Sequence, residues 1–241
     1  MKDQVTIRYD SFTTVYDIDS NGIDVGDPLA TDGGLAVGTG LSNNLVTALI
    51  PAEVFDTGPS DNKYGEEWLM SFSFTGLGGV VSAMSGGVPV PMYGPGLIEL
   101  YITFDGVTFN NFMDLNVTAG LPIGGLNLEI FGEVDFTTVD AGYNDLFHSA
   151  DHSCLGSDSF FDIWTNCNEA MKISFFIDQN TDPLDVTIAG PFDGGAGPDY
   201  WELTSSHDGS VTFNVPEPSS LALAGIALLG MAGAARRRKS A

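Results

Sequence analysis

Positive charge is scarce in this chain of 241 residues. Eight Lys and Arg residues stand against 32 Asp and Glu, and half of the eight lie in the last six residues. Residues 1–215 therefore hold 31 acids and four bases, a formal charge of −27. Such a charge repels nucleic acid and anionic membrane surfaces and favours cations. We expect no nucleic-acid partner.

Complete catalytic motifs are also lacking. The sequence has no Gly-x-Ser-x-Gly elbow, no P-loop, no Cys/His nucleophile pattern and no His-Glu-x-x-His. We therefore expect that the protein is not an enzyme. Two carboxylates at the correct separation could hydrolyse a glycoside, which leaves a glycosidase as an alternative, but among 32 acids no pair stands out.

Helical periodicity of useful length is missing before residue 215. Short β-type runs separated by Gly, Asn, Asp and Pro dominate instead, and in Leu126 to Val134 apolar and polar residues alternate as in a half-buried strand. We predict an all-β fold, a single antiparallel β-sandwich or jelly-roll-like domain over residues 1–214. The other predicted strands are Val5 to Tyr9, Thr13 to Ile18, Leu69 to Phe74, Ile98 to Phe104, Met171 to Ile177, Val186 to Ile188 and Val211 to Val215.

Two Gly-rich segments are predicted to be long surface loops, Gly76 to Gly96 and Phe192 to Pro198. The first of them could also mark a boundary between two modules, although strands on both sides could equally share one sheet. A single domain is the preferred interpretation for a body of this size.

The last residues, 215–241, differ from the rest. Pro216-Glu217-Pro218 precedes an uncharged apolar run at 221–235, predicted to be a helix, and a basic cluster of Arg236, Arg237, Arg238 and Lys239. Prolines before an apolar span and cations behind it favour membrane insertion with the basic end retained in the cytoplasm. The body would then lie outside.

This order of elements resembles the PEP-CTERM sorting signal of Gram-negative bacteria. The resemblance implies export across the inner membrane, recognition by an exosortase, and processing near Pro216-Glu217-Pro218 with removal of the helix and the basic tail. Fifteen apolar residues fall short of the ~20 that span a bilayer, which favours transient insertion. A permanent C-terminal anchor is the alternative.

An exported chain is expected to start with a signal peptide, yet Met1 to Arg8 turn polar at once. Three explanations stay open, in this order of preference. The start codon was assigned too far downstream, residues before Met1 were lost, or the tail only mimics a sorting signal.

The two cysteines, Cys154 and Cys167, are expected to form a disulfide, which an exported setting permits. Closing a loop of this size would contribute roughly 3 kcal/mol in the chain-entropy model. Two free thiols are the alternative, and two cysteines this far apart make no zinc motif by themselves.

A candidate calcium loop offers oxygen donors at alternate positions and Gly22 at the sixth, as the sharp turn of such a loop requires. Pro28 stands where a bidentate Glu would complete the shell, so Asp24 or Asp27 would have to substitute. An acidic hairpin turn without metal is the alternative. The predicted Ca²⁺ ligands are Asp17, Asp19, Asn21 and Asp24.

All three tryptophans lie beside acids: Trp68, Trp164 and Trp201. Aromatic faces stack on the CH groups of sugars while carboxylates accept hydrogen bonds from hydroxyls, so the three could form a saccharide-binding face if the fold brings them together. Burial of the rings in a β core is the alternative.

A second and looser resemblance, to flocculation-associated PEP-CTERM proteins, rests on three segments: Phe160 to Trp164, Phe175 to Leu184, and Asp208 to Phe213. It implies a role in cell aggregation. We therefore expect an exported protein of the cell envelope or extracellular matrix, with a structural role in exopolysaccharide, biofilm or floc and with polysaccharide as a partner. A lectin-like, calcium-dependent module is the second hypothesis.

Overall fold

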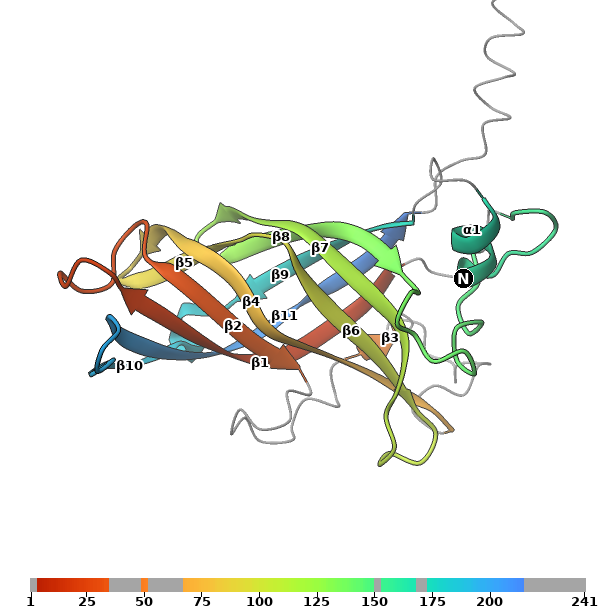
Figure 1. Ribbon diagram of the computed structural model, residues 1–241, viewed down its shortest axis with the longest axis horizontal. Helices are drawn as coiled ribbons and strands as arrows, with labels where there is room; N and C mark the ends of the chain where they lie inside the picture. Colours follow the sequence, from red (N-terminus) through yellow and green to blue (C-terminus); the bar gives the residue numbers. More distant parts are fainter. Residues whose placement is uncertain (1–3, 35–48, 52–66, 150–152, 168–172, 215–241) are drawn as a thin grey trace, which may run out of the picture.

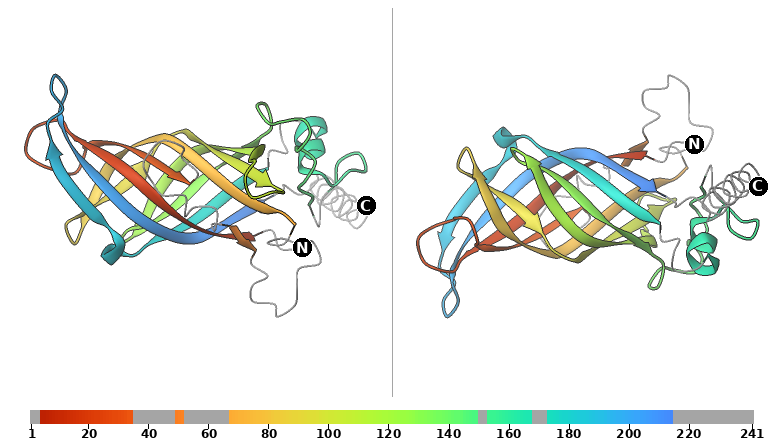
Figure 2. Two further views of the ribbon diagram at one scale, coloured as in Figure 1. Left: turned by 90° about the horizontal axis from the view of Figure 1, so that it is seen from below. Right: turned by 90° about the horizontal axis from the view of Figure 1, so that it is seen from above.

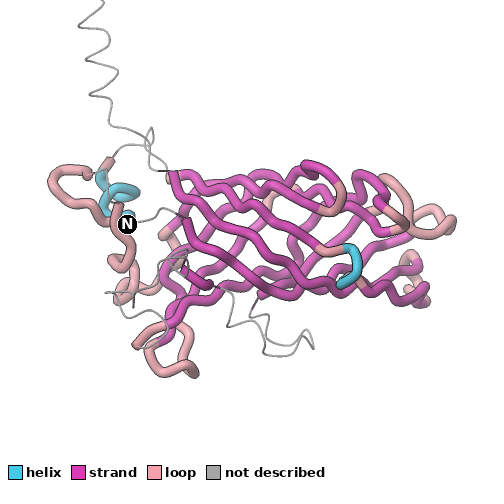
Figure 3. Tube along the Cα trace, turned by 180° about the vertical axis from the view of Figure 1, so that it is seen from behind, coloured by secondary structure: helices cyan, strands magenta, loops and turns pink. Residues whose placement is uncertain are grey.

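The computed structural model describes residues 4–34, 49–51, 67–149, 153–167 and 173–214, and most of these residues lie in strands (Figure 1; Figure 3). The β-strands are β1 (Gln4–Asp17), β2 (Pro28–Gly34), β3 (Leu49–Pro51), β4 (Leu69–Ser85), β5 (Val88–Tyr93), β6 (Gly96–Thr103), β7 (Asn110–Gly124), β8 (Asn127–Asp135), β9 (Ser174–Thr181), β10 (Thr187–Phe192) and β11 (Asp199–Asn214). The helical elements of the described residues are α1 (Phe160–Asn166) and the 3-10 turn η4 (Pro183–Asp185).

The strands form one antiparallel sheet that closes on itself. β1 pairs with β2 along one side and with β11 along the other, where the register runs from Gln4 opposite Thr212 to Asp17 opposite Asp199. From β2 the pairing continues through β4, β6, β7, β8 and β9 and returns to β11. Figure 2 shows the long strands winding around a common axis.

The all-β antiparallel prediction is confirmed, whereas the prediction of a sandwich is wrong. A sandwich needs two sheets packed face to face. Here the first and last strands are hydrogen-bonded partners, so a single sheet encloses the core.

Alternation along the strands places apolar side chains inside the closed sheet. In β8 every second residue from Leu128 to Val134 faces inward, with Gly132 at the third of these positions, and the residues between them are half-buried on the outer side. The largest fully buried side chains include Phe112, Phe175 and Leu115. The core therefore lies on the axis of the sheet.

One end of the closed sheet is covered by the segment between β8 and β9. Helix α1 lies beyond the strand ends there, as Figure 1 shows, and its Phe160 ring packs 5.8 Å from Phe213 near the end of β11. Ser159 caps the helix by accepting a hydrogen bond from the Asp162 amide. A disulfide joins Cys154 to Cys167, the residue that follows the helix.

The prediction of a loop over Gly76 to Gly96 is wrong, because this segment forms the second half of β4, all of β5 and the start of β6. Gly86 and Gly87 connect β4 to β5 with φ angles of 60° and 87°. A two-residue turn with both φ angles positive suits the twist of a hairpin, and glycine adopts it without steric cost. The Gly-rich segment after β10 is a turn, and the predicted helix at 221–235 lies outside the described residues.

Candidate functional site

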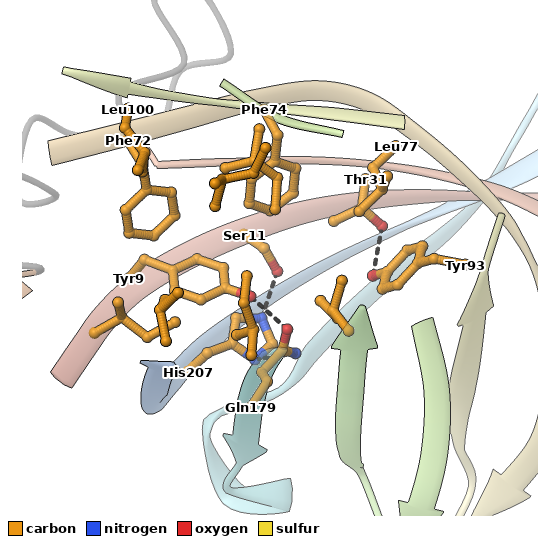
Figure 4. A pocket seen from close by; sticks show the side chains of 16 residues that line it. Tyr9, Ser11, Thr31, Phe72, Phe74, Leu77, Tyr93, Leu100, Gln179 and His207 are labelled. Atoms are coloured by element: carbon orange, nitrogen blue, oxygen red, sulfur yellow. Dashed lines mark hydrogen bonds between the residues drawn. The ribbon is translucent and has the colours of Figure 1, made fainter. Parts of the chain in front are cut away.

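Polar side chains from three neighbouring strands meet inside the closed sheet. We call them the interior polar cluster: Tyr9, Ser11, Gln179, Thr181, Ser205 and His207. Figure 4 shows four of them, Tyr9, Ser11, Gln179 and His207, converging below Phe72 and Phe74. Tyr9, Ser11, Gln179 and His207 are each less than a tenth exposed. Buried polar groups without partners are costly, so the hydrogen bonds of this cluster decide whether it is tolerated.

The cluster forms a continuous hydrogen-bonded chain. The Tyr9 hydroxyl donates to Gln179 Oε1 at 2.5 Å, and Gln179 Nε2 lies 3.1 Å from His207 Nδ1. Because an amide nitrogen only donates, Nδ1 accepts this bond and the ring proton is on Nε2. That N–H points at the hydroxyl oxygens of Ser11 and Ser205, at 2.6 and 2.9 Å. The imidazole is therefore neutral.

Burial also fixes the protonation states in the cluster. Desolvation lowers the pKa of His207 to about 3 and raises the pKa of Tyr9 well above its ordinary value. The Tyr93 hydroxyl lies nearby and is hydrogen-bonded to the Thr31 hydroxyl at 3.0 Å. Burial raises the pKa of Tyr93 to about 12. At neutral pH the cluster carries no charge.

Two small cavities flank the cluster, with volumes of about 30 and 40 Å³. The first is lined mostly by apolar groups such as Phe74 and Leu77, and the second extends past Leu29 toward the β4–β5 hairpin. Cavities of this size hold one to a few water molecules. The interior is a packed core with a polar centre rather than a chamber for a large ligand.

The acidic loop, residues 17–27 between β1 and β2, contains the predicted calcium ligands. Carboxylate oxygens of Asp17, Asp19 and Asp27 lie within 4.8 Å of one another. Asp17 and Asp27 are buried, with 6% and 1% of their surface exposed, whereas Asp19 is exposed. Oxygen donors of this kind suit Ca²⁺. The loop therefore brings together two of the four predicted ligands, Asp17 and Asp19. The third carboxylate is Asp27, one of the two residues that the sequence offered in place of the missing Glu.

Hydrogen bonds hold the remaining predicted ligands in the loop. The side-chain amide of Asn21 donates to Asp19 at 2.8 Å and to Asp24 at 3.0 Å, so its nitrogen, not its oxygen, faces these carboxylates. Backbone amides of Asn21 and Gly22 donate to Asp17 at 3.1 and 2.8 Å. To coordinate a cation, the Asn21 amide would have to turn over.

The pKa values of Asp17 and Asp19 in this loop are shifted in opposite directions. Desolvation is the largest effect at both Asp17 and Asp19 and acts to raise each pKa. At Asp17 the hydrogen bonds from Gly22, Asn21 and Ser20 outweigh it, and the pKa is lowered. At Asp19 the negative charges of Asp24 and Asp17 add to desolvation, and the pKa is raised. The charge of Asp19 is thus less favoured than that of Asp17.

The three tryptophans do not converge. Trp164 lies on α1 and packs 5.7 Å from Phe136, at the covered end of the sheet. Trp201 lies opposite Val15 on β1, twelve residues along β11 from Phe213, and therefore near the other end. Trp68 directly precedes β4, and all three rings are half-buried against the core. They form no common saccharide-binding face.

The sorting segment begins where the sheet ends. β11 ends at Asn214, and residues 214–239 match the family model of the PEP-CTERM protein-sorting motif. The chain carries a PEP-CTERM sorting motif. This match contains Pro216, Glu217, Pro218, Arg236, Arg237, Arg238 and Lys239. Of the matched residues, the structure describes only Asn214.

The PEP-CTERM motif indicates that an exosortase recognises the protein and that it is exported to the cell envelope. No curated protein and no solved structure matches the chain. Among the described residues, no helix has the length and apolar character needed to cross a membrane.

Proposed function

We propose that this PEP-CTERM protein is a non-enzymatic component of the cell surface or extracellular matrix of a Gram-negative bacterium. Its role is structural, in exopolysaccharide, biofilm or floc. The observation that carries the proposal is the position of the motif: it starts at the last residue of β11. Processing near Pro216-Glu217-Pro218 would remove the apolar run and the basic tail and leave every strand of the closed sheet intact.

The charge of the body supports a matrix role. With the tail removed, residues 1–215 carry a formal charge of −27. Cross-strand neighbours on the outer side include Glu129 opposite Asp178. Facing carboxylates repel each other, and divalent cations relieve such repulsion. A protein of this kind is suited to cation-bridged contact with an anionic polysaccharide.

The interior also supports a non-catalytic role. Ser11 and His207 lie 2.6 Å apart, as a nucleophile and its base would, but they are 2% and 8% exposed. A pKa of about 3 makes His207 a very weak base at neutral pH. The pair is thus placed to hold β1 and β11 together.

Truncation tests the proposal. We expect the full chain in the envelope or matrix fraction and a chain ending at Asn214 to be missing from it. The matched variant is Pro216→Ala/Pro218→Ala, which keeps the apolar run and the basic tail. Intact-mass measurement of the mature protein reports whether residues after the motif are removed. Unchanged surface display of the truncated chain would contradict the proposal, and a mature protein with an intact tail would indicate a permanent anchor.

A lectin-like module that depends on Ca²⁺ is the second candidate, favoured by the cluster of Asp17, Asp19 and Asp27 oxygens. A glycan array with and without EDTA separates the two functions. Selective binding that EDTA abolishes, and that Asp19→Asn also abolishes, supports the lectin. Absence of selective binding with either buffer supports the structural role.

A further inference from the structure

Two long segments of this acidic chain contain no charged residue. Residues 68–98 and 115–128 hold no Asp, Glu, Lys, Arg or His, although the chain has 32 acids. The fold places the two segments together. Val80 on β4 pairs with Met92 on β5, and Tyr93 pairs with Gly120 on β7. Among the described residues, the outer surface where these two segments meet is therefore free of charge.

Apolar side chains are exposed on this side. We call it the neutral face and define it by Met92, Leu97, Leu121 and Ile123, with the half-buried Val80 opposite Met92. Tyr93 and Gly120 are buried, so their neighbours Met92 and Leu121 point outward, 38% and 44% exposed. Leu97 and Ile123 are 42% and 52% exposed. Contiguous exposed apolar residues on a soluble domain mark an interaction site.

The rest of the cylinder is different. β8, β9 and β11 carry outward-facing carboxylates at Glu129, Glu133, Asp178 and Asp208, none of them in the buried class. Glu129 also lies opposite Leu121 and so marks the border of the neutral face. The described outer surface thus has an acidic part, to which Glu99 on β6 also belongs, and a neutral part around the β4–β5 hairpin and the second half of β7.

A partner would contact the neutral face through its side chains rather than by adding a strand to the sheet. β5 and β7 pair only at Tyr93 and Gly120 and are unpaired with each other beyond that point. Pro89, Pro91 and Pro122 lie in these unpaired stretches. Because proline has no amide hydrogen to donate, the exposed strand edges are poor templates for another strand.

We propose that the neutral face is the interface between two copies of this chain. The charge distribution selects this occupant. Two copies repel each other wherever their carboxylates meet, and a cationic partner would be drawn to the acidic surface instead. A two-fold arrangement through the neutral faces buries Met and Leu side chains and places both acidic surfaces outside. This inference goes beyond the structural role above and does not depend on a polysaccharide.

Sedimentation velocity of the full chain without added detergent tests the proposal. We expect a dimer that forms with rising protein concentration and becomes tighter at higher salt, which screens the residual repulsion. Leu121→Asp and Met92→Asp place a carboxylate in the contact and should weaken association by about tenfold or more. Leu184→Asp is the matched control, because Leu184 is 91% exposed on η4, outside the neutral face.

Each outcome either supports or overturns the proposed dimer. Dissociation in the two neutral-face variants, with unchanged thermal unfolding and with a dimeric Leu184→Asp control, supports the proposal. A wild type that stays monomeric at every concentration overturns it. Association that survives Leu121→Asp also overturns it, because the contact would then come from the apolar tail. A monomer that binds zwitterionic lipid vesicles through the same residues overturns it as well.

Discussion

Gln179 and His207 lie side by side on β9 and β11, with the Gln179 amide nitrogen 3.1 Å from His207 Nδ1. This contact fixes a neutral imidazole in the centre of the core. The titratable groups facing the ring are Tyr9, whose ring centroid is 4.7 Å away, and Tyr93, which lines the same cavity. Both are uncharged at neutral pH because burial raises their pKa values. Among the described residues, no group facing the ring compensates a positive charge.

Acid should therefore destabilise the fold through His207. Its folded pKa of about 3 lies below the unfolded value of 6.5, so the unfolded chain takes up the proton first. The stabilisation is complete above about pH 6.5 and declines by roughly 1.4 kcal/mol per pH unit below it. We expect the difference in unfolding free energy between the wild type and His207→Gln to be large at pH 7 and to shrink at this rate toward pH 3. A difference independent of pH would contradict the assignment.

His148 provides a control of opposite sign. Its Nδ1 lies 2.9 Å from Asp158 in an exposed pair, and the hydrogen bond to Asp158 raises the pKa of His148. Stabilisation by this pair is present below the unfolded pKa and is lost as the pH rises through the folded value. The difference between the wild type and His148→Gln should therefore decrease from pH 6 to pH 8, measured by the same denaturant titrations.

Asp19→Asn should stabilise the metal-free protein and abolish any response to Ca²⁺. The raised pKa of Asp19, caused by desolvation and by Asp24 and Asp17, shows that its charge is unfavourable. Removing that charge relieves repulsion, but it also removes a ligand that Ca²⁺ would need. Thermal unfolding with added Ca²⁺ measures both effects. If the wild-type midpoint does not rise with Ca²⁺, the acidic loop is a metal-free turn.

Leu115→Ala should cost about 2–5 kcal/mol, the usual range for a fully buried leucine. Leu115 is 0% exposed and lines the first cavity from the middle of β7. Leu184→Ala is the matched control, since this leucine is 91% exposed and its truncation should change stability by less than about 0.5 kcal/mol. Equal losses in the two variants, measured by urea unfolding, would place Leu115 outside the core.

Reduction of the Cys154–Cys167 disulfide should lower the unfolding free energy by roughly 3 kcal/mol, because the bond closes a short loop in the unfolded chain. The cost should fall on the segment that covers the end of the sheet, where Phe160 and Ile163 are buried. Dithiothreitol should therefore destabilise the wild type and leave a Cys154→Ala/Cys167→Ala variant unchanged. Equal sensitivity of both proteins to the reductant would contradict a structural role for the bond.

Strand content could be predicted from the sequence, but closure could not. Alternation of Asn127, Glu129 and Glu133 with apolar neighbours identified β8, which the structure places at Asn127–Asp135. β7 was missed because Phe112 through Leu115 are buried on both faces, which hides the period of two. Closure depends on β1 recognising β11 across almost the whole chain, and local patterns contain no information on such pairing.

The candidate sites were predictable to different degrees. The oxygen spacing from Asp17 to Asp24 identified the acidic loop, but only the folded turn shows that Asp27 joins Asp17 and Asp19. The interior polar cluster was missed although a signal existed: Gln179 continues the inward positions of Phe175 and Ile177 on β9. A polar residue at an inward position of a strand indicates a buried hydrogen-bond network.

The pairing of β1 with β11 also sets the order of events during biogenesis. The sheet cannot close until Asn214 has been made and delivered, since the last strand supplies the partner for the first. Contacts so far apart in sequence form late and slowly. The strand that closes the sheet ends at Asn214, where the match to the PEP-CTERM motif begins, so closure of the fold and the sorting motif depend on adjoining residues.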